Sequence, residues 1–203
     1  MQRRQPAAAK TQGSAGEDRP ARERLLAVAG ELFYRQGIRS VGVDEIIAAA
    51  DVAKMSLYRS FASKDALIAE YLRERDESYW RHWDAVIERH PEGPRAQLLA
   101  LFRSLARRAV RPDWRGCPFT NAAIEFPEPD HPGRRVAEAH KRELRRRLRD
   151  LARAAGAHDA AALGDQLVLL FEGVYASVQT FGAKGPAAAV VQAVDAVIAA
   201  QLH

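Results

Sequence analysis

One short segment of the chain concentrates side chains that can bind a nucleic-acid backbone. Lys54 and Arg59 are positively charged, and Ser56 and Tyr58 carry hydroxyl groups. Hydroxyl, ammonium and guanidinium groups donate hydrogen bonds to phosphate oxygens, and the cationic groups also bind the edge of a guanine base. The chemistry that this segment offers is therefore recognition of a phosphate-bearing partner by positioned donors.

Two short helices with a tight turn between them are expected to position these donors. Apolar residues at helical spacing predict one helix over about residues 43–50 and, after a break at 51–53, a second over about 54–60. An amphipathic helix that begins after Pro20 and ends at Gly37 is expected to pack against the pair. This arrangement is a helix-turn-helix, whose second helix enters the major groove of DNA.

The second of these helices has an inward and an outward side. Leu57 and Phe61 lie one turn apart and are expected to anchor it to the rest of the head. The outward residues, which are expected to contact DNA, are Lys54, Met55, Ser56, Tyr58 and Arg59.

Residues 22–72 resemble the DNA-binding head of the TetR-type transcriptional regulators. The most specific part is the run over 57–67, which follows the pattern Leu-Tyr-x-x-Phe-x-x-Lys-x-x-Leu. The resemblance implies that Tyr58 contacts a phosphate and that Lys64 is the family's phosphate-contacting lysine. It also implies a homodimer that binds a palindromic operator in double-stranded DNA, usually as a repressor, and a small-molecule effector that releases the DNA.

Three positions depart from the family's pattern. Gly42 stands where the second helix usually opens with Thr or Ser, Asp51 where the turn usually has glycine, and Ala53 where the third helix usually begins with Ser or Thr. Each missing hydroxyl weakens a helix cap by about 1 kcal/mol. The phosphate contact usually made from position 42 is therefore open to question.

The net charge gives a weaker indication than the placement of these residues. The 203 residues include 31 Lys and Arg and 26 Asp and Glu, for a net charge of +5. Residues 1–66 hold 11 basic and 8 acidic residues, whereas residues 103–153 hold 14 basic and 7 acidic ones. Because leucines hold one face of the helix in this second block inward, we expect its arginines to form a solvent face rather than a DNA contact.

Several other classes of protein and of site are disfavoured. A single cysteine, Cys117, cannot form an internal disulfide or a Cys-rich zinc site, and it stays open as a redox-sensitive thiol. The first residues lack the apolar region of a secretion signal, and no apolar run approaches the roughly 20 residues of a membrane helix. No glycine-rich phosphate loop, His-x-x-x-His spacing or nucleophile elbow occurs. We therefore expect a cytoplasmic protein that is no enzyme, without membrane, metal or cofactor.

The whole chain is expected to be all-α, with an N-terminal three-helix helix-turn-helix head, a C-terminal helical bundle and about nine helices. Apolar stripes at helical spacing continue to the C-terminus, and no segment is bounded like a strand. We expect a disordered arm over 1–19, a DNA-binding domain over 20–66, and a ligand-binding and dimerisation domain over 67–203.

The bundle is expected to hold a ligand pocket. Large amphipathic side chains gather between residues 71 and 175, and such residues line small-molecule sites in bundles. The broken segment over 112–132 is expected to act as a gate. The residues expected to line the pocket are Trp83, Phe102, Asn121, Phe171 and Tyr175.

A dimer interface is expected on the last two helices, where charge is sparse and small residues recur. Small residues let helices approach closely, so two helices from each subunit can form a four-helix interface about a two-fold axis. The residues expected there are Leu163, Leu170, Gly173, Ser177, Val190, Val194 and Val197. A second hypothesis stays open: an all-α small-molecule-binding or catalytic bundle with a vestigial head, which sequence-specific DNA binding would distinguish.

Overall fold

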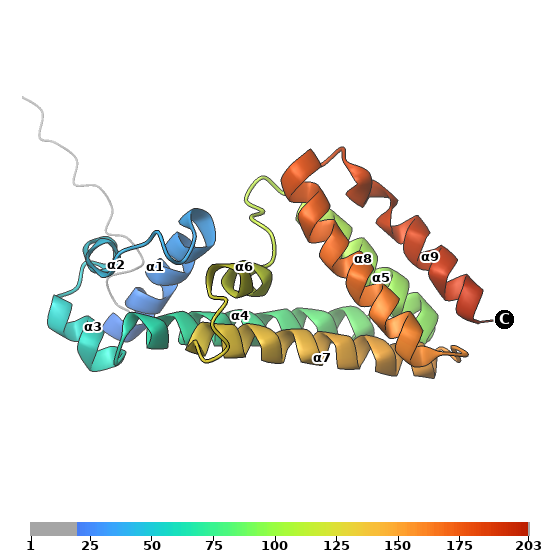
Figure 1. Ribbon diagram of the computed structural model, residues 1–203, viewed down its shortest axis with the longest axis horizontal. Coiled ribbons are helices and arrows are strands. Elements are labelled where there is room, and N and C mark those ends of the chain that lie inside the picture. The colour runs from blue at the N-terminus through green and yellow to red at the C-terminus, as the bar shows by residue number, and fades with distance from the viewer. Residues whose placement is uncertain (1–19, 203) are drawn as a thin grey trace, which may run out of the picture.

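The structure, a computed structural model, describes residues 20–202 and contains only helices over that range (Figure 1). The expected arm over 1–19 lies outside the described residues. The elements are α1 (Ala21–Gln36), α2 (Val43–Ala50), α3 (Lys54–Ser60), α4 (Lys64–Glu88), α5 (Pro94–Ala109), α6 (Pro118–Glu125), α7 (Pro132–Ala154), α8 (Ala160–Phe181), the 3₁₀ helix η1 (Pro186–Ala189) and α9 (Val190–Gln201). The all-α prediction is confirmed.

The first three helices form a small head around one apolar core. Phe33 of α1, Ile46 of α2 and Leu57 of α3 are each buried, so each short helix contributes one face to the same centre. The turn between α2 and α3 lies at the predicted break. There Asp51 adopts a left-handed conformation with φ of 49°, which Asp tolerates better than most residues other than glycine.

The N-terminal ends of the helices in the head are capped by a side chain only where the sequence supplies a hydroxyl group at the cap position. Gly42 and Ala53 precede α2 and α3 without any capping side-chain hydrogen bond. Ser63, in contrast, accepts a hydrogen bond from the amide of Ala66 at 3.1 Å and caps α4. The two helices of the helix-turn-helix therefore depend on packing rather than on capping for their ends.

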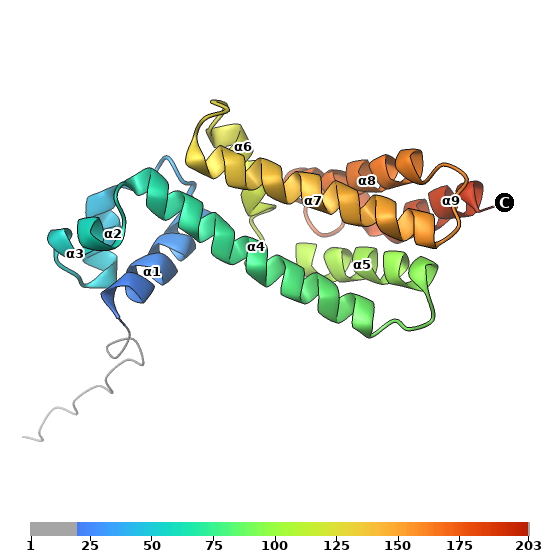
Figure 2. The same ribbon diagram turned by 90° about the horizontal axis from the view of Figure 1, so that it is seen from below.

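Helix α4 joins the head to the bundle without interruption (Figure 2). Its first turns bury Leu67 and Tyr71 against the head, and its later turns bury Trp83 and Val86 in the bundle. The predicted boundary between residues 66 and 67 falls inside this helix. A displacement of α4 is therefore transmitted directly from one region to the other, whatever boundary is drawn.

The bundle is built from α4, α5, α7, α8 and α9, with the short α6 packed on α7 (Figures 1 and 2). Helix α7 lies between α4 and α8, and α9 packs on α5 and α8. Among residues 20–202, α8 is the one helix that is long and apolar enough to cross a membrane, whereas the sequence was expected to contain no apolar run of that length. Core helices of bundles meet the same criteria, and α8 carries Asp165 and Glu172 in ion pairs with α7.

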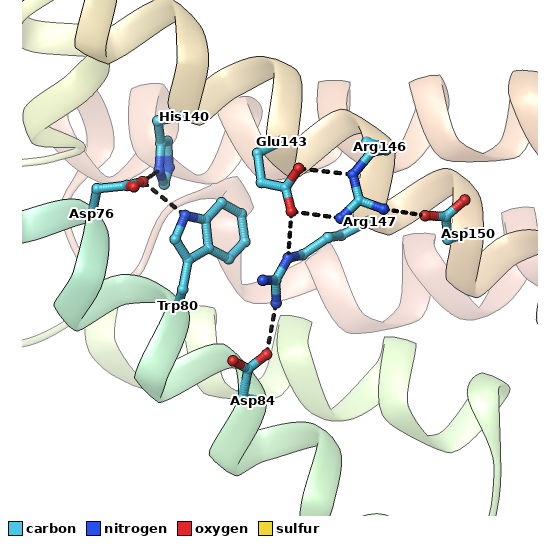
Figure 3. Close-up of polar contacts among 8 residues, drawn as sticks. All are labelled: Asp76, Trp80, Asp84, His140, Glu143, Arg146, Arg147 and Asp150. Carbon is cyan, nitrogen blue, oxygen red and sulfur yellow. Dashed lines mark hydrogen bonds and ion pairs between the residues drawn. The ribbon is translucent and has the colours of Figure 1, made fainter. Parts of the chain in front are cut away.

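The arginines of α7 are paired with carboxylates along the same helix and across to α4 (Figure 3). Arg146 contacts Glu143 at 2.6 Å and Asp150 at 2.7 Å. Arg147 joins Glu143, at 2.8 Å, to Asp84 of α4, at 2.6 Å. Exposed pairs of this kind add little stability, but they neutralise the most basic segment of the chain. This pairing agrees with the expectation that the segment forms a solvent face.

A buried polar group lies beside this network, between α4 and α7 (Figure 3). His140 is 3% exposed, its Nδ1 lies 2.7 Å from a carboxylate oxygen of Asp76, and Trp80 donates to the same oxygen at 2.8 Å. The ring of Phe119 stacks on the imidazole with a centroid distance of 3.6 Å. Burial lowers the pKa of His140 to about 4, so the ring is neutral at physiological pH and donates to Asp76.

This histidine is expected to make the protein less stable as the pH falls from about 6.5 to about 4. The ordinary pKa of 6.5 applies to the unfolded chain and the value of about 4 to the folded one. Within that window the unfolded state binds the proton and the folded state does not, so the free energy of unfolding decreases with decreasing pH. Denaturant unfolding at a series of pH values measures the slope.

The variant His140→Gln should flatten that slope, and His158→Gln, at an exposed histidine, is the matched control. His82, whose pKa is also lowered by burial, adds to the slope in the same direction. A slope that His140→Gln leaves unchanged would contradict the assignment.

Candidate nucleic-acid interface and ligand cavity

Helix α3 presents the predicted DNA-contacting side chains on one exposed face. Leu57 is fully buried and Phe61, just after the helix, is 5% exposed, so the helix is held by the side that carries them. On the other side Met55 is 76% exposed and Tyr58 is 47% exposed. An exposed methionine and tyrosine side by side on a seven-residue helix form a surface that is open for a partner.

The cationic side chains around α3 hold local contacts in the absence of DNA. Lys54 pairs with Asp44 of α2 at 3.0 Å, which raises the pKa of Lys54, and Arg59 donates to the hydroxyl of Ser56 at 3.3 Å. Lys54 and Arg59 are exposed and Ser56 is half-buried. Exposed contacts of this strength are weak enough to be exchanged for phosphate contacts.

Lys64 occupies a different environment from the residues of α3. Its ammonium group donates to the carbonyl of Ile38 at 2.9 Å and lies 5.9 Å from the centroid of the Phe33 ring. Burial lowers its pKa. Since an ammonium has three donors, Lys64 ties α4 to the α1–α2 loop and keeps further donors for a phosphate.

A cavity of about 350 Å³ lies where the head meets the bundle. Its walls come from α1, α4, α5, α6, α8 and the loop between α5 and α6. The lining residues are Tyr34, Arg75, Ser78, Tyr79, His82, Arg108, Arg111, Asp113, Trp114, Gly116, Cys117, Pro118, Phe119 and Tyr175. An annex of about 20 Å³ adjoins it, bounded by Trp83 and Phe171 and sharing Tyr79, His82, Arg108 and Tyr175 with it.

The predicted pocket residues divide into three groups. Tyr175 lines the main cavity and the annex, whereas Trp83 and Phe171 line the annex alone. Phe102 lines neither space because it is fully buried edge-on against Phe171, at a centroid distance of 5.0 Å. Asn121 lines neither because its amide turns to the carbonyl of Arg115, at 3.0 Å. For these last two positions the pocket prediction needs correction.

Sequence reasoning missed Tyr34, Arg75 and Arg108 as lining residues. Helical periodicity identifies the side of a helix that is buried, but it does not show where neighbouring helices leave space between them. Trp114 and Cys117, in the segment expected to act as a gate, do form part of the wall.

Of the seven residues predicted for the dimer interface, three are buried within their own chain and four are at least partly exposed. Leu163, Val190 and Val194 are buried within the chain, since their exposed fractions are 0%, 5% and 0%. Leu170, Ser177 and Val197 are half-buried, and Gly173 is exposed. The most apolar side of each helix faces its own bundle, so apolar periodicity selects the core rather than an interface.

The open face of α8 is a separate stripe. Leu169 (72% exposed), Gly173, Ala176 and Thr180 follow one another at steps of four, three and four residues, which places them on one side of the helix. A Cβ added at Gly173 would meet nothing within 4 Å apart from the backbone of its own helix and the adjacent residues. This stripe, rather than the buried one, is available to a second subunit.

Two hydrogen-bonded contacts connect the head with the wall of the cavity. The hydroxyl of Tyr34, on α1, donates to the carbonyl of Gly116 at 3.1 Å and accepts from the amide of Arg115 at 2.9 Å. Glu125, at the end of α6, accepts from the amide of Arg39 in the head at 2.7 Å. The position of the head is thus coupled to the loop and the helix that border the cavity.

Comparison with known proteins agrees with this geometry in both halves of the chain. Residues 25–71 match the profile of bacterial regulatory proteins of the tetR family, and residues 94–194 match that of the tetracyclin repressor-like C-terminal domain. SCO4454, a TetR-family transcriptional regulator from Streptomyces coelicolor, is 34% identical, with a TM-score of 0.86 over 90% of this chain and 96% of that one.

More distant relatives share the arrangement. The HTH-type transcriptional regulator YjdC of Escherichia coli is 25% identical over 75% of this chain and 80% of its own. CifR, a TetR-family regulator solved with a 26 bp operator, is 21% identical, with a TM-score of 0.72 over 93% of this chain and 99% of that one. The chain therefore belongs to the tetR family of bacterial regulatory proteins and is a DNA-binding transcriptional regulator, not an enzyme.

Proposed function

We propose that the protein is a cytoplasmic, homodimeric repressor that binds a palindromic operator and releases it when a small molecule occupies the cavity. The observation that carries the proposal is that one residue of the head, Tyr34, forms part of the cavity wall. A ligand in that cavity therefore lies against the head itself. The predicted DNA contacts are those of Lys54, Met55, Ser56, Tyr58, Arg59 and Lys64.

The mechanism is a shift between two arrangements of the heads. A dimer presents two α3 helices to successive major grooves, which are about 34 Å apart along DNA. A ligand that favours a different position of α1 and α4 changes this spacing and lowers the operator affinity by the same factor by which DNA lowers the ligand affinity. The contacts of Tyr34 with residues 115 and 116 are the direct link between the two sites.

The open stripe on α8 supports the homodimer. Its small residues leave room for close approach of a second helix, and α9 adds exposed Ala196 and Ala200 beside half-buried Val197. Pairs of helices from two subunits then form a four-helix interface about a two-fold axis. The same axis relates the two recognition helices, which is what a palindromic site requires.

A binding titration on the DNA upstream of the gene tests the proposal. We expect sequence-specific binding whose affinity falls steeply as salt increases, since phosphate contacts release counterions. A shuffled sequence of equal length is the control. Equal binding of both sequences at every salt concentration would exclude an operator-binding function and favour the vestigial-head hypothesis.

The variant Tyr34→Phe is expected to loosen the link between head and cavity. It removes the hydroxyl that accepts from the amide of Arg115 and donates to the carbonyl of Gly116. Loss of a half-buried hydroxyl with two partners should lower the free energy of unfolding by about 1–2 kcal/mol. Hydrogen exchange should show faster exchange at the amide of Arg115.

The matched control is Tyr58→Phe, which removes an exposed hydroxyl outside the cavity. It should leave both the stability and the exchange of Arg115 unchanged. Equal protection of the Arg115 amide in Tyr34→Phe and in the wild type would contradict the proposed link.

A further inference from the structure

We propose that the cavity binds a small organic anion, namely a carboxylate attached to a planar apolar body. The inference rests on the proposed ligand-responsive function, because it names the chemical class of the effector. It is carried by the charge of the cavity wall and by the shape of its aromatic part.

The cavity wall carries more positive charge than its own carboxylate balances. Arg111 is neutralised by Asp113, with two contacts of 3.1 Å. Arg75 and Arg108, in contrast, have no carboxylate oxygen within 4 Å anywhere in residues 20–202. The arginines of α7, in contrast to these two, each have a carboxylate partner in the same chain, as Arg146 and Arg147 illustrate. Two uncompensated guanidinium groups in one cavity favour an anionic ligand.

Aromatic rings support both of these guanidinium groups from one side. The guanidinium carbon of Arg75 lies 5.7 Å from the ring centroid of Tyr34 and 5.4 Å from that of Tyr71, and that of Arg108 lies 6.0 Å from the ring of Trp114. A guanidinium above an aromatic ring is attracted by the electron density of the ring and still has N–H groups that can donate. The planar fork of a guanidinium matches the two oxygens of a carboxylate, which suits these arginines to bind one.

The two arginines differ in depth. Arg75 is exposed, whereas Arg108 is half-buried and borders both the main cavity and the annex. The positive charge of Arg108 also contributes to lowering the pKa of neighbouring His82, after burial, which keeps that ring neutral. Arg108 is therefore the principal anchor for the anionic group, because its charge is the less screened by water.

The remaining wall is flat and aromatic. Trp114 and Tyr175 stack with a centroid distance of 5.5 Å and an interplanar angle of 12°, and Tyr79 and Phe119 border the same space. A volume of about 350 Å³ lies at the small end of the range of roughly 300–1,000 Å³ for ligand sites. A planar body fills this part of the cavity, whereas an inorganic anion would leave it empty.

A matched panel of ligands on the full chain tests the proposal. The carboxylates are benzoate, 2-naphthoate and indole-3-acetate, each compared with its neutral amide and with an amine of the same ring system. Inorganic phosphate is a further arm. Thermal stabilisation reports binding, and so does protection of Cys117 from iodoacetamide. Cys117 is the single cysteine of the chain, is 3% exposed and lines the cavity, so its modification reports on the wall of this site.

We expect at least one carboxylate to stabilise the protein and protect Cys117, with its amide about tenfold weaker and the amine and phosphate inactive. Arg108→Gln should weaken carboxylate binding about tenfold or more and leave amide binding unchanged. Arg103→Gln, at an exposed arginine on the same helix that does not line the cavity, is the control and should bind like the wild type.

Three results would overturn the proposal: amides or amines that bind as well as the carboxylates, no carboxylate binding at millimolar concentration, or carboxylate binding that Arg108→Gln does not weaken. Failure of the proposed function looks different. Carboxylate binding without operator binding would leave the anion site standing and remove the repressor function. Operator release by a neutral ligand, with no binding of any carboxylate, would leave the repressor function standing and remove the anion site.

Discussion

Replacing Tyr58 by alanine is expected to weaken binding of the dimer to its operator by about thirtyfold or more. The side chain is 47% exposed on α3, where its hydroxyl can donate to a phosphate oxygen of the DNA backbone. Single contacts of a recognition helix are worth about 1–3 kcal/mol, and a dimer loses two copies. Fluorescence anisotropy at one stated salt concentration measures the change.

Two controls separate loss of contact from loss of fold. Leu57→Ala empties a fully buried position on the same helix, so it should lower the melting temperature, which Tyr58→Ala should not. Arg153→Ala removes an exposed cation that pairs with Asp150 on α7 and should leave operator affinity unchanged. Wild-type affinity in Tyr58→Ala would show that α3 does not dock as proposed.

Replacing Gly173 by arginine is expected to convert the dimer into a monomer and to weaken operator binding by about a hundredfold or more. Gly173 lies on the open stripe of α8, and an added Cβ meets nothing within 4 Å apart from the backbone of its own helix and the adjacent residues. The chain should therefore fold normally, since glycine is unfavourable inside a helix by about 1 kcal/mol relative to better helix formers. Across a close helix–helix interface, however, the guanidinium would be buried against its own copy without a carboxylate.

Sedimentation or light scattering measures the oligomeric state, and far-UV circular dichroism checks the helices. Ala154→Arg, at an exposed alanine near the end of α7, adds the same side chain away from the stripe and should remain dimeric. A dimeric Gly173→Arg variant that still binds the operator would place the interface elsewhere.

The head is the part of the fold that the sequence predicts best. The predicted recognition helix over 54–60 coincides with α3, and the predicted break at 51–53 is the observed turn. Ser63 caps α4, the next helix of the chain. These features are local, because hydrogen bonds to near neighbours and the one-turn spacing of Leu57 and Phe61 determine them. The prediction of which residues contact DNA rests on the same spacing.

The pocket and the interface are harder to predict than the helices. Both depend on which side of each helix stays open after the helices have packed, and the sequence does not show this directly. The apolar stripes through Leu163 of α8 and Val194 of α9 prove to be core, while the stripe through Leu169 and Gly173 of α8 is open. Likewise, Phe102 is a plain core residue, and the cavity owes its positive charge to Arg75 and Arg108, which no motif marks. Folding favours burial of the most apolar side of each helix. A binding face is therefore found on the sides that stay exposed after folding.

The sequence by itself determined that this protein is all-α, that it has a helix-turn-helix head, and that it is a TetR-type regulator. Helical period, capping and the run over 57–67 are encoded by residues close together in the chain. Only the tertiary structure decided that Tyr34 meets residues 115 and 116, and that Arg75 and Arg108 share a cavity. Those contacts join segments far apart in sequence, and the packing of α1, α4 and α5 alone brings them together.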